Sequence, residues 1–198
     1  SGALTPPDSA RQALSVEFIG SVEAASSYLT ALGLSGPATN GQCDITDLYT
    51  AKFGTPEPGK KVFIEMVVPA SAAATDSAAA ATAVLNKVEE ANILGIFCSN
   101  EATVKGLLAA TNDGADLPRL YDGVTVIGYD AGAGQKNAVR NQYFLGSITQ
   151  DPYSIGYKAV ELAVKAINGE SISDVDTGAK FYNYMNMDDD DIKGLLYD

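Results

Sequence analysis

The amino-acid sequence predicts an α/β fold, with a parallel, doubly wound sheet of the Rossmann-like or flavodoxin-like kind in a three-layer αβα arrangement. From Lys61 almost to the end of the 198-residue chain, short apolar runs alternate with amphipathic helical patterns. Strands that alternate with helices in this way are typical of right-handed βαβ units, which build parallel sheets with helices on both faces. A hydrophobic content of 46% is enough to form a real core.

The predicted strands are short apolar runs, many of them bounded by turn residues. The most apolar run, ILGIFC, ends abruptly in Ser-Asn-Glu, and we interpret it as a buried strand that delivers Asn100 to the mouth of the sheet. The predicted strands cover residues 14–20, 62–68, 94–98, 124–129, 144–149 and 180–184.

Helical spacing of apolar residues predicts the elements between these strands, at 23–32, 44–53 with Asp44 as cap, 75–91, 101 to about 111, and 133–141. The last helix is the best defined. Asp151 is a suitable N-cap, Pro152 occupies the first helical position, and Gly169 ends the helix. We expect its apolar stripe to be buried. This stripe consists of Ile155, Ala159, Leu162, Ala163, Ala166 and Ile167.

The regularity of the pattern changes near Lys61. Residues 1–60 are punctuated by Gly, Pro, Ser and Thr and are expected to form an irregular N-terminal segment, whereas residues 61–198 form one regular α/β lobe. The start of the chain has neither the basic nor the apolar region of a signal peptide, so we expect an export signal or lipid anchor to be absent from this sequence.

The charge balance and apolar content exclude several classes of partner. Acidic side chains number 25 against 13 basic ones, a net charge of -12, which disfavours nucleic acid. No apolar stretch reaches the roughly 18 to 20 residues of a membrane span, so no direct membrane insertion is expected.

The residue types present argue against an enzyme. The chain contains no histidine, which excludes Ser-His and Cys-His nucleophiles and His-ligated zinc. Cys43 and Cys98 can form one disulfide or none. The Gly132-Ala-Gly134 turn lacks the third glycine of a dinucleotide-binding loop, because Asn137 occupies its place. The acidic run at 188–191 lacks the Gly and Glu of a calcium loop, so a solvated turn is expected. We therefore expect no catalytic residue, cofactor or metal.

Three successive strands end in a polar residue: Asn100, Asp130 and Gln150. In a parallel sheet these ends meet at one edge, where small ligands bind in open α/β folds. Two amides and a carboxylate suit a polyhydroxylated ligand that needs several hydrogen bonds. An alternative for the first strand end is that Ser99 or Asn100 caps the following helix.

Several motifs resemble one family. They are GIFCSNEATVKGLL at 95–108, VIGYDAG at 126–132 and SITQDPYSIGYKAVELAVKAINGE at 147–170, and in this order they are similar to the C-terminal part of the type I periplasmic solute-binding proteins, the group of ribose- and galactose-binding proteins. The tail at 176–198 resembles relatives in Gram-positive bacteria.

This resemblance implies the sugar-binding component of an ABC importer, whose two lobes close on a mono- or small saccharide. It implies an extracytoplasmic location, at the cell surface or in the periplasm, a lipid anchor in the full product, and a membrane permease as partner. It gives Asn100, Asp130 and Gln150 the roles of ligand-binding residues, with Gln150 near the hinge. Ala72 and Ala73 occupy the place of an aromatic that stacks on the sugar in relatives.

The resemblance also implies a chain that is mainly the second lobe, with residues 1–60 as a possible remnant of the first. In the complete family, the helix after Gln150 packs in the first lobe. The principal alternative is the effector-binding lobe of a lactose-repressor-type transcription regulator, which shares the fold. A folded lobe that binds nothing is a further alternative.

Overall fold

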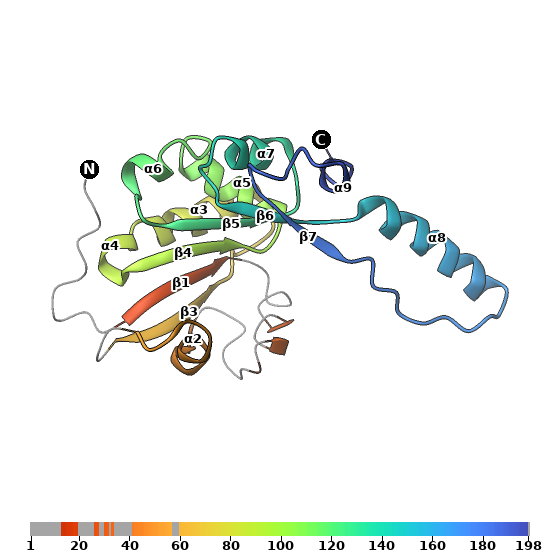
Figure 1. The fold of residues 1–198 in the computed structure, drawn as a ribbon, viewed down its shortest axis with the longest axis horizontal. Helices are drawn as coiled ribbons and strands as arrows, with labels where there is room; N and C mark the ends of the chain where they lie inside the picture. Colours follow the sequence, from red (N-terminus) through yellow and green to blue (C-terminus); the bar gives the residue numbers. More distant parts are fainter. Residues whose placement is uncertain are drawn as a thin grey trace.

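A computed structural model describes residues 13–19, 26–27, 30–31, 33, 41–56 and 60–197. Its described strands form one sheet in the order β2-β3-β1-β4-β5-β6-β7 (Figure 1). The strands are β1 Ala13–Ile19, β2 Gly41–Asp44, β3 Lys61–Val67, β4 Ile93–Cys98, β5 Thr125–Tyr129, β6 Gly146–Gln150 and β7 Ala179–Tyr182.

The inner strands of the sheet are parallel, as the sequence predicts. β1 pairs in parallel with β3 and β4, and β5 pairs in parallel with β4 and β6. The two edge strands, β2 and β7, run antiparallel to their neighbours. The described part of residues 1–60 contributes two strands to this sheet, β1 between β3 and β4 and β2 at the edge beside β3.

The helices follow the predicted order with three differences, of which one is α9 at Asp190–Lys193, where the acidic run was expected to form a solvated turn. The predicted helix at 75–91 is divided into α3 and α4, and the short α6 lies in the loop before β5. Most of the helix predicted at 23–32 lies outside the described residues. The described helices are α2 Thr46–Phe53, α3 Ala74–Leu85, α4 Val88–Ala91, α5 Glu101–Ala110, α6 Leu117–Leu120, α7 Ala133–Arg140, α8 Pro152–Ile167 and α9 Asp190–Lys193.

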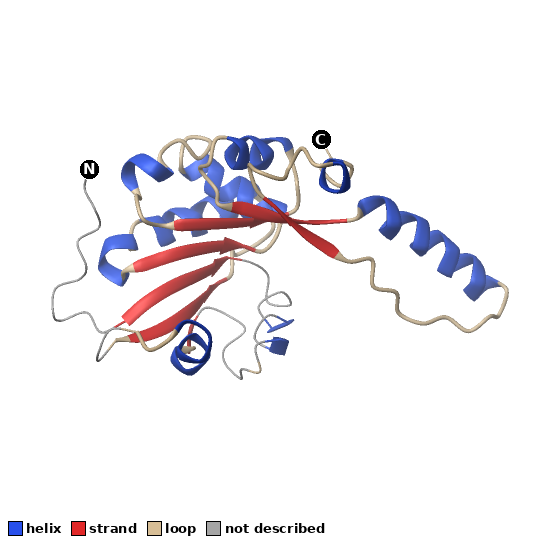
Figure 2. Cartoon of the chain, viewed as in Figure 1, coloured by secondary structure: helices blue, strands red, loops and turns tan. Residues whose placement is uncertain are grey.

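The main core lies between the sheet and the helical layer that contains α3, α5 and α7 (Figure 2). Strand residues such as Ile96 and Val126 face this layer and are buried with Leu107 of α5. A Cβ on Gly106 would lie 2.5 Å from the carbonyl carbon of Ser77, so glycine at this position lets α5 approach α3 closely.

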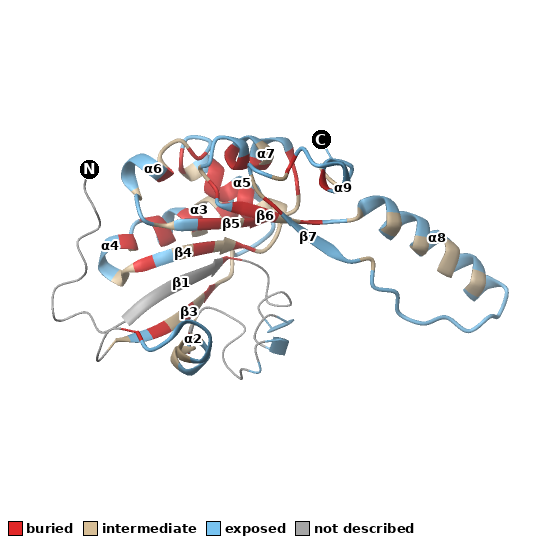
Figure 3. Cartoon of the chain, in the orientation of Figure 1, coloured by how far each residue is buried: buried red, intermediate tan, exposed pale blue. Residues whose placement is uncertain are grey.

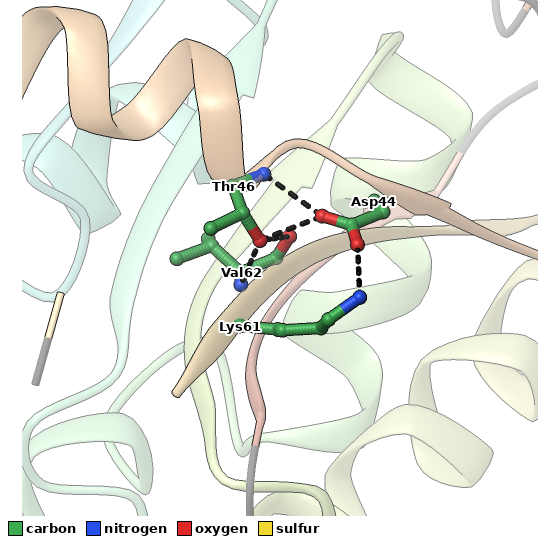
Figure 4. Close-up of polar contacts among 4 residues, drawn as sticks. All are labelled: Asp44, Thr46, Lys61 and Val62. Carbon is green, nitrogen blue, oxygen red and sulfur yellow. Dashed lines mark hydrogen bonds and ion pairs between the residues drawn. The ribbon is translucent and has the colours of Figure 1, made fainter. Parts of the chain in front are cut away.

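The first described helix is anchored to the sheet by polar contacts (Figure 4). The Asp44 carboxylate accepts a hydrogen bond from the Thr46 N–H at 2.9 Å and pairs with Lys61 at 2.9 Å. The Thr46 hydroxyl accepts a hydrogen bond from the Val62 N–H at 3.0 Å. The hydrogen bonds from Thr46, followed by the contact with Lys61, lower the pKa of Asp44 to about 2. The prediction of Asp44 as the cap of this helix is wrong by one residue: Asp44 is the last residue of β2 and Ile45 is the N-cap, although the Asp44 carboxylate does accept the N–H of Thr46 in the first turn.

Helix α8 extends away from the body of the sheet, and the chain returns along an extended segment to β7 (Figures 1 and 3). None of its residues is buried, and Tyr153, Val160 and Ile167 are 79%, 66% and 85% exposed. The prediction of a buried stripe on this helix is therefore wrong for the structure described, because no described element packs against α8. The helix is nonetheless capped by Asp151, whose side chain accepts the Ser154 N–H.

Two further predictions concern membranes and thiols. None of the described helices combines the length and apolar composition needed to cross a bilayer. Cys43 and Cys98 are both buried free thiols, so they do not form a disulfide. Burial raises the pKa of Cys98 to about 12.

Candidate functional site

The three strand-end residues follow adjacent parallel strands. Asn100 comes after β4, Asp130 comes after β5, and Gln150 is the last residue of β6. Asn100 and Asp130 are brought together, because the N–H of Glu101 donates a hydrogen bond to the Asp130 carboxylate at 3.0 Å. Gln150 lies at the same edge with an exposed side chain, and no described contact joins that side chain to the other two.

Asn100 is the N-cap of α5. Its Oδ1 accepts the Thr103 N–H at 2.9 Å, and the Thr103 hydroxyl in turn accepts the Asn100 N–H at 3.4 Å, which completes a capping box. The capping interpretation is therefore confirmed. The side-chain amide nitrogen of Asn100 donates to no described residue, so the cap leaves this donor available at the edge of the sheet.

Asp130 combines an unusual backbone with a partly buried carboxylate. Its φ of 77° lies in the left-handed region, which Asp tolerates better than most residues. Burial is the main cause of a raised Asp130 pKa, and the charge of Glu101 adds to it, while the hydrogen bond from the Glu101 N–H opposes it. Because the pKa of Asp130 is higher in the folded chain than in the unfolded chain, the free energy of unfolding falls as pH rises from the unfolded pKa through the folded pKa. The ionised carboxylate therefore destabilises the fold at neutral pH.

Four residues at this edge were missed by the sequence reasoning. Three buried side chains donate a hydrogen bond to the backbone carbonyl of Asp130: Gln135, Ser147 and Tyr182. A polar residue on the buried side of a predicted helix was the available signal for Gln135. Tyr197 interacts with the backbone of Ala131 and the charge of Asp130, and burial raises the pKa of its phenol.

The glycine-rich turn after β5 has a packing role. A Cβ on Gly132 would lie 2.5 Å from a carboxylate oxygen of Glu101, so this glycine makes room for an acidic side chain. A carboxylate at that position opposes the binding of a pyrophosphate, which agrees with the expectation against a dinucleotide site. The described residues contain no cluster of acidic or thiol side chains that could hold a metal ion.

Comparisons with known proteins identify a family that shares this fold. Residues 56–171 match the family model described as a periplasmic binding protein domain. No curated protein sequence matches the chain.

Solved structures share the fold over nearly the whole chain. An ABC transporter, LacI family transcriptional regulator from Brachyspira murdochii is 30% identical, with a TM-score of 0.69 over 95% of this chain and 56% of that one. A carbohydrate transporter solute-binding protein from Agrobacterium radiobacter, solved with D-arabinose, is 25% identical, with a TM-score of 0.65 over 94% of this chain and 56% of that one. An ABC transporter solute-binding protein from Bacillus halodurans is 17% identical, with a TM-score of 0.62 over 92% of this chain and 55% of that one.

The chain thus spans about half the length of the solved structures it matches. The family match covers more than half of its residues, and the α/β sheet with its parallel inner strands is the type I periplasmic-binding-protein fold. This chain belongs to the periplasmic binding protein domain family.

Proposed function

We propose that this chain is a sugar-binding lobe of an ABC-type solute-binding protein. The observation that carries the proposal is the placement of Asn100, Asp130 and Gln150 at the ends of three adjacent parallel strands, where the Asp130 carboxylate accepts the N–H of Glu101, the residue after Asn100, and the Asn100 amide nitrogen donates to no described residue. Neutral polyhydroxylated ligands need this mixture of charged acceptors and amide donors. The D-arabinose complex of the Agrobacterium radiobacter protein, which is 25% identical, supports a monosaccharide as ligand.

Each residue has a distinct role in this proposal. One Asp130 carboxylate oxygen is engaged by the Glu101 N–H, and the carboxylate retains acceptor capacity for sugar hydroxyls. Asn100 caps α5 through its oxygen and donates to the sugar through its nitrogen. Gln150 contributes an exposed amide where the chain leaves the sheet for α8. Binding involves no catalytic residue and no cofactor.

The cellular setting follows from the same assignment. We propose an extracytoplasmic location and a membrane permease of an ABC transporter as the partner that accepts the sugar. A second lobe would enclose the sugar from the other side, so an isolated half-site is expected to bind weakly.

A thermal-shift panel tests sugar binding. D-arabinose, D-ribose, D-galactose, D-fucose, D-tagatose and myo-inositol are added to the chain at millimolar concentration, and the melting temperature is measured. At least one is expected to raise it, and failure of the whole panel would contradict the proposal.

The isosteric variant Asp130→Asn sharpens this test. Asn also tolerates the left-handed backbone, so the fold is retained, and removal of the buried charge should raise the melting temperature without sugar at pH 7. The same variant should lose the shift caused by sugar. Asp122→Asn, an exposed turn position, is the matched control and should keep that shift.

An effector lobe of a lactose-repressor-type regulator is the second candidate. The 30% identical structure from Brachyspira murdochii is described both as an ABC transporter and as a LacI family transcriptional regulator. Both candidates bind a small molecule at the same edge, so sugar binding does not separate them. Binding of the full-length gene product to operator DNA would favour regulation, whereas its copurification with a permease would favour transport.

A further inference from the structure

The backbone carbonyl of Asp130 is the centre of a buried hydrogen-bond cluster. Gln135 Nε2 donates to it at 3.0 Å, the Ser147 hydroxyl at 3.1 Å and the Tyr182 hydroxyl at 3.0 Å. The three donors come from α7, β6 and β7, and their residues are 2%, 0% and 0% exposed. A carbonyl oxygen has two lone pairs, so three donors on one oxygen restrain this peptide unusually strongly.

Gln135 makes more hydrogen-bonding contacts in this cluster than Ser147 or Tyr182. Its Nε2 also donates to the Tyr129 carbonyl at 3.0 Å and contacts the Ser147 hydroxyl. Because both carbonyls can only accept, the side-chain nitrogen must face them, which directs Oε1 the other way. Oε1 is buried without a hydrogen-bond partner in the described part of the chain. An apolar side chain would avoid that cost, so stability alone is a poor explanation for glutamine here.

The neighbouring strand leaves room for this amide. A Cβ on Gly128 would lie 2.6 Å from Gln135 Nε2 and 3.1 Å from the Ser147 hydroxyl. Glycine at position 128 therefore allows the side-chain amide of Gln135 to reach the end of β5. Asp130, the residue that follows β5, has a left-handed backbone conformation.

We infer that Gln135 is a positioning residue for Asp130, which it holds in the left-handed conformation that places the carboxylate against the Glu101 N–H. This inference rests on the proposed function, because it assigns to Gln135 the orientation of the carboxylate that receives the sugar hydroxyls. Ser147 and Tyr182 support the same peptide. Gln135 acts through Asp130 and does not itself contact the sugar.

A readout that needs no sugar tests the positioning. The Glu101 N–H has the Asp130 carboxylate as its acceptor among the described residues, so its hydrogen exchange reports whether that carboxylate stays in place. Gln135→Met keeps much of the volume and removes both donors. We expect Glu101 amide exchange, measured by NMR, to accelerate by about tenfold, the factor expected from one or two net hydrogen bonds.

Thr111→Val is the matched control. Thr111, the C-cap of α5, is fully buried, and its hydroxyl donates to the Leu107 carbonyl at 2.7 Å. Its replacement should lower overall stability while leaving the ratio of Glu101 exchange to that of core amides unchanged. Unchanged Glu101 exchange in Gln135→Met, or equal acceleration in both variants, would overturn the inference.

Conservative variants keep the test decisive if Gln135→Met fails to fold. Tyr182→Phe and Ser147→Ala each remove one hydroxyl from the Asp130 carbonyl, and each should accelerate Glu101 exchange to a smaller degree. D-arabinose binding is measured on the same samples. If no sugar in the panel binds the wild-type chain, the proposed function fails while the exchange data still decide the role of Gln135.

Discussion

Two substitutions of Asn100 separate its role as a helix cap from its proposed role as a sugar contact. Asn100→Ala removes both the oxygen that accepts the Thr103 N–H at 2.9 Å and the amide nitrogen, which donates to no residue in the described part of the chain. Asn100→Ser supplies a hydroxyl that can accept the Thr103 N–H but provides no amide donor. Loss of an N-cap costs about 1 kcal/mol, whereas serine caps nearly as well as asparagine.

The expected results differ between stability and binding. In a chain of this length, about 1 kcal/mol corresponds to a decrease in melting temperature of roughly 2 to 4 °C. Asn100→Ala should show this decrease, and Asn100→Ser should remain close to the wild type. Both variants should weaken the melting shift caused by D-arabinose, because both lack the amide donor. Urea unfolding and sugar titration measure the two effects on the same samples.

Two outcomes would contradict these roles of Asn100. A wild-type sugar response in Asn100→Ser would show that the amide nitrogen does not contact the ligand and that Asn100 is a cap alone. An unchanged melting temperature in Asn100→Ala would show that the capping box contributes little to α5. Asn137→Ala, at an exposed position of α7, is the control for an asparagine outside the site and should leave sugar binding unchanged.

Three further predictions concern stability. Asp44→Ala should destabilise the chain above pH 4. The difference in stability from wild type should disappear as pH falls through the folded pKa of Asp44, about 2, because protonation of the carboxylate removes the same contacts. Urea unfolding at a series of acidic pH values measures this difference. Leu107→Ala should cost about 2 to 5 kcal/mol in a calorimetric or urea measurement, whereas Val160→Ala should stay within about 0.5 kcal/mol, because Leu107 is fully buried and Val160 is 66% exposed. Cys98 should resist thiol reagents until the chain unfolds, because its thiol is buried with a pKa near 12; rapid labelling of native protein would contradict this.

The alternation of strands and helices could be predicted because it depends on local pattern. The run from Ile93 to Cys98 is strand β4, and Asn100 begins the following helix, both from signals within a few residues. The Asp151-Pro152 start of α8 is likewise local and is confirmed. The presence of Asn100 and Asp130 at one edge followed from the parallel arrangement alone.

Features that depend on distant contacts could not be predicted in this way. The apolar stripe of α8 indicates that the helix is suited to packing, but a stripe does not identify the surface that covers it, and no described element does so. The antiparallel pairing of β7 depends on how the chain returns from α8. Gln135 became a candidate only when the fold placed its amide against the Asp130 carbonyl, because a polar residue on the buried side of a predicted helix does not by itself reveal which group it contacts.

Several features that destabilise the fold lie near the edge of the sheet where β4 and β5 end. They are observed in this structure and do not depend on similarity to other proteins. Asp130 combines a left-handed backbone with a carboxylate whose pKa is raised by burial. Of the three buried side-chain atoms without a hydrogen-bond partner among the described residues, Ser99 Oγ belongs to the turn after β4 and Gln135 Oε1 to the side chain whose nitrogen contacts the Asp130 carbonyl, whereas Ser77 Oγ lies between α3 and α5. Backbone strain, partly buried charges and unpaired polar atoms cluster at functional sites in proteins. Their coincidence favours this edge over the exposed face of α8 as the candidate site for a small polar ligand, because the charged side chains of α8 are paired with one another, Lys158 and Lys165 with Glu161.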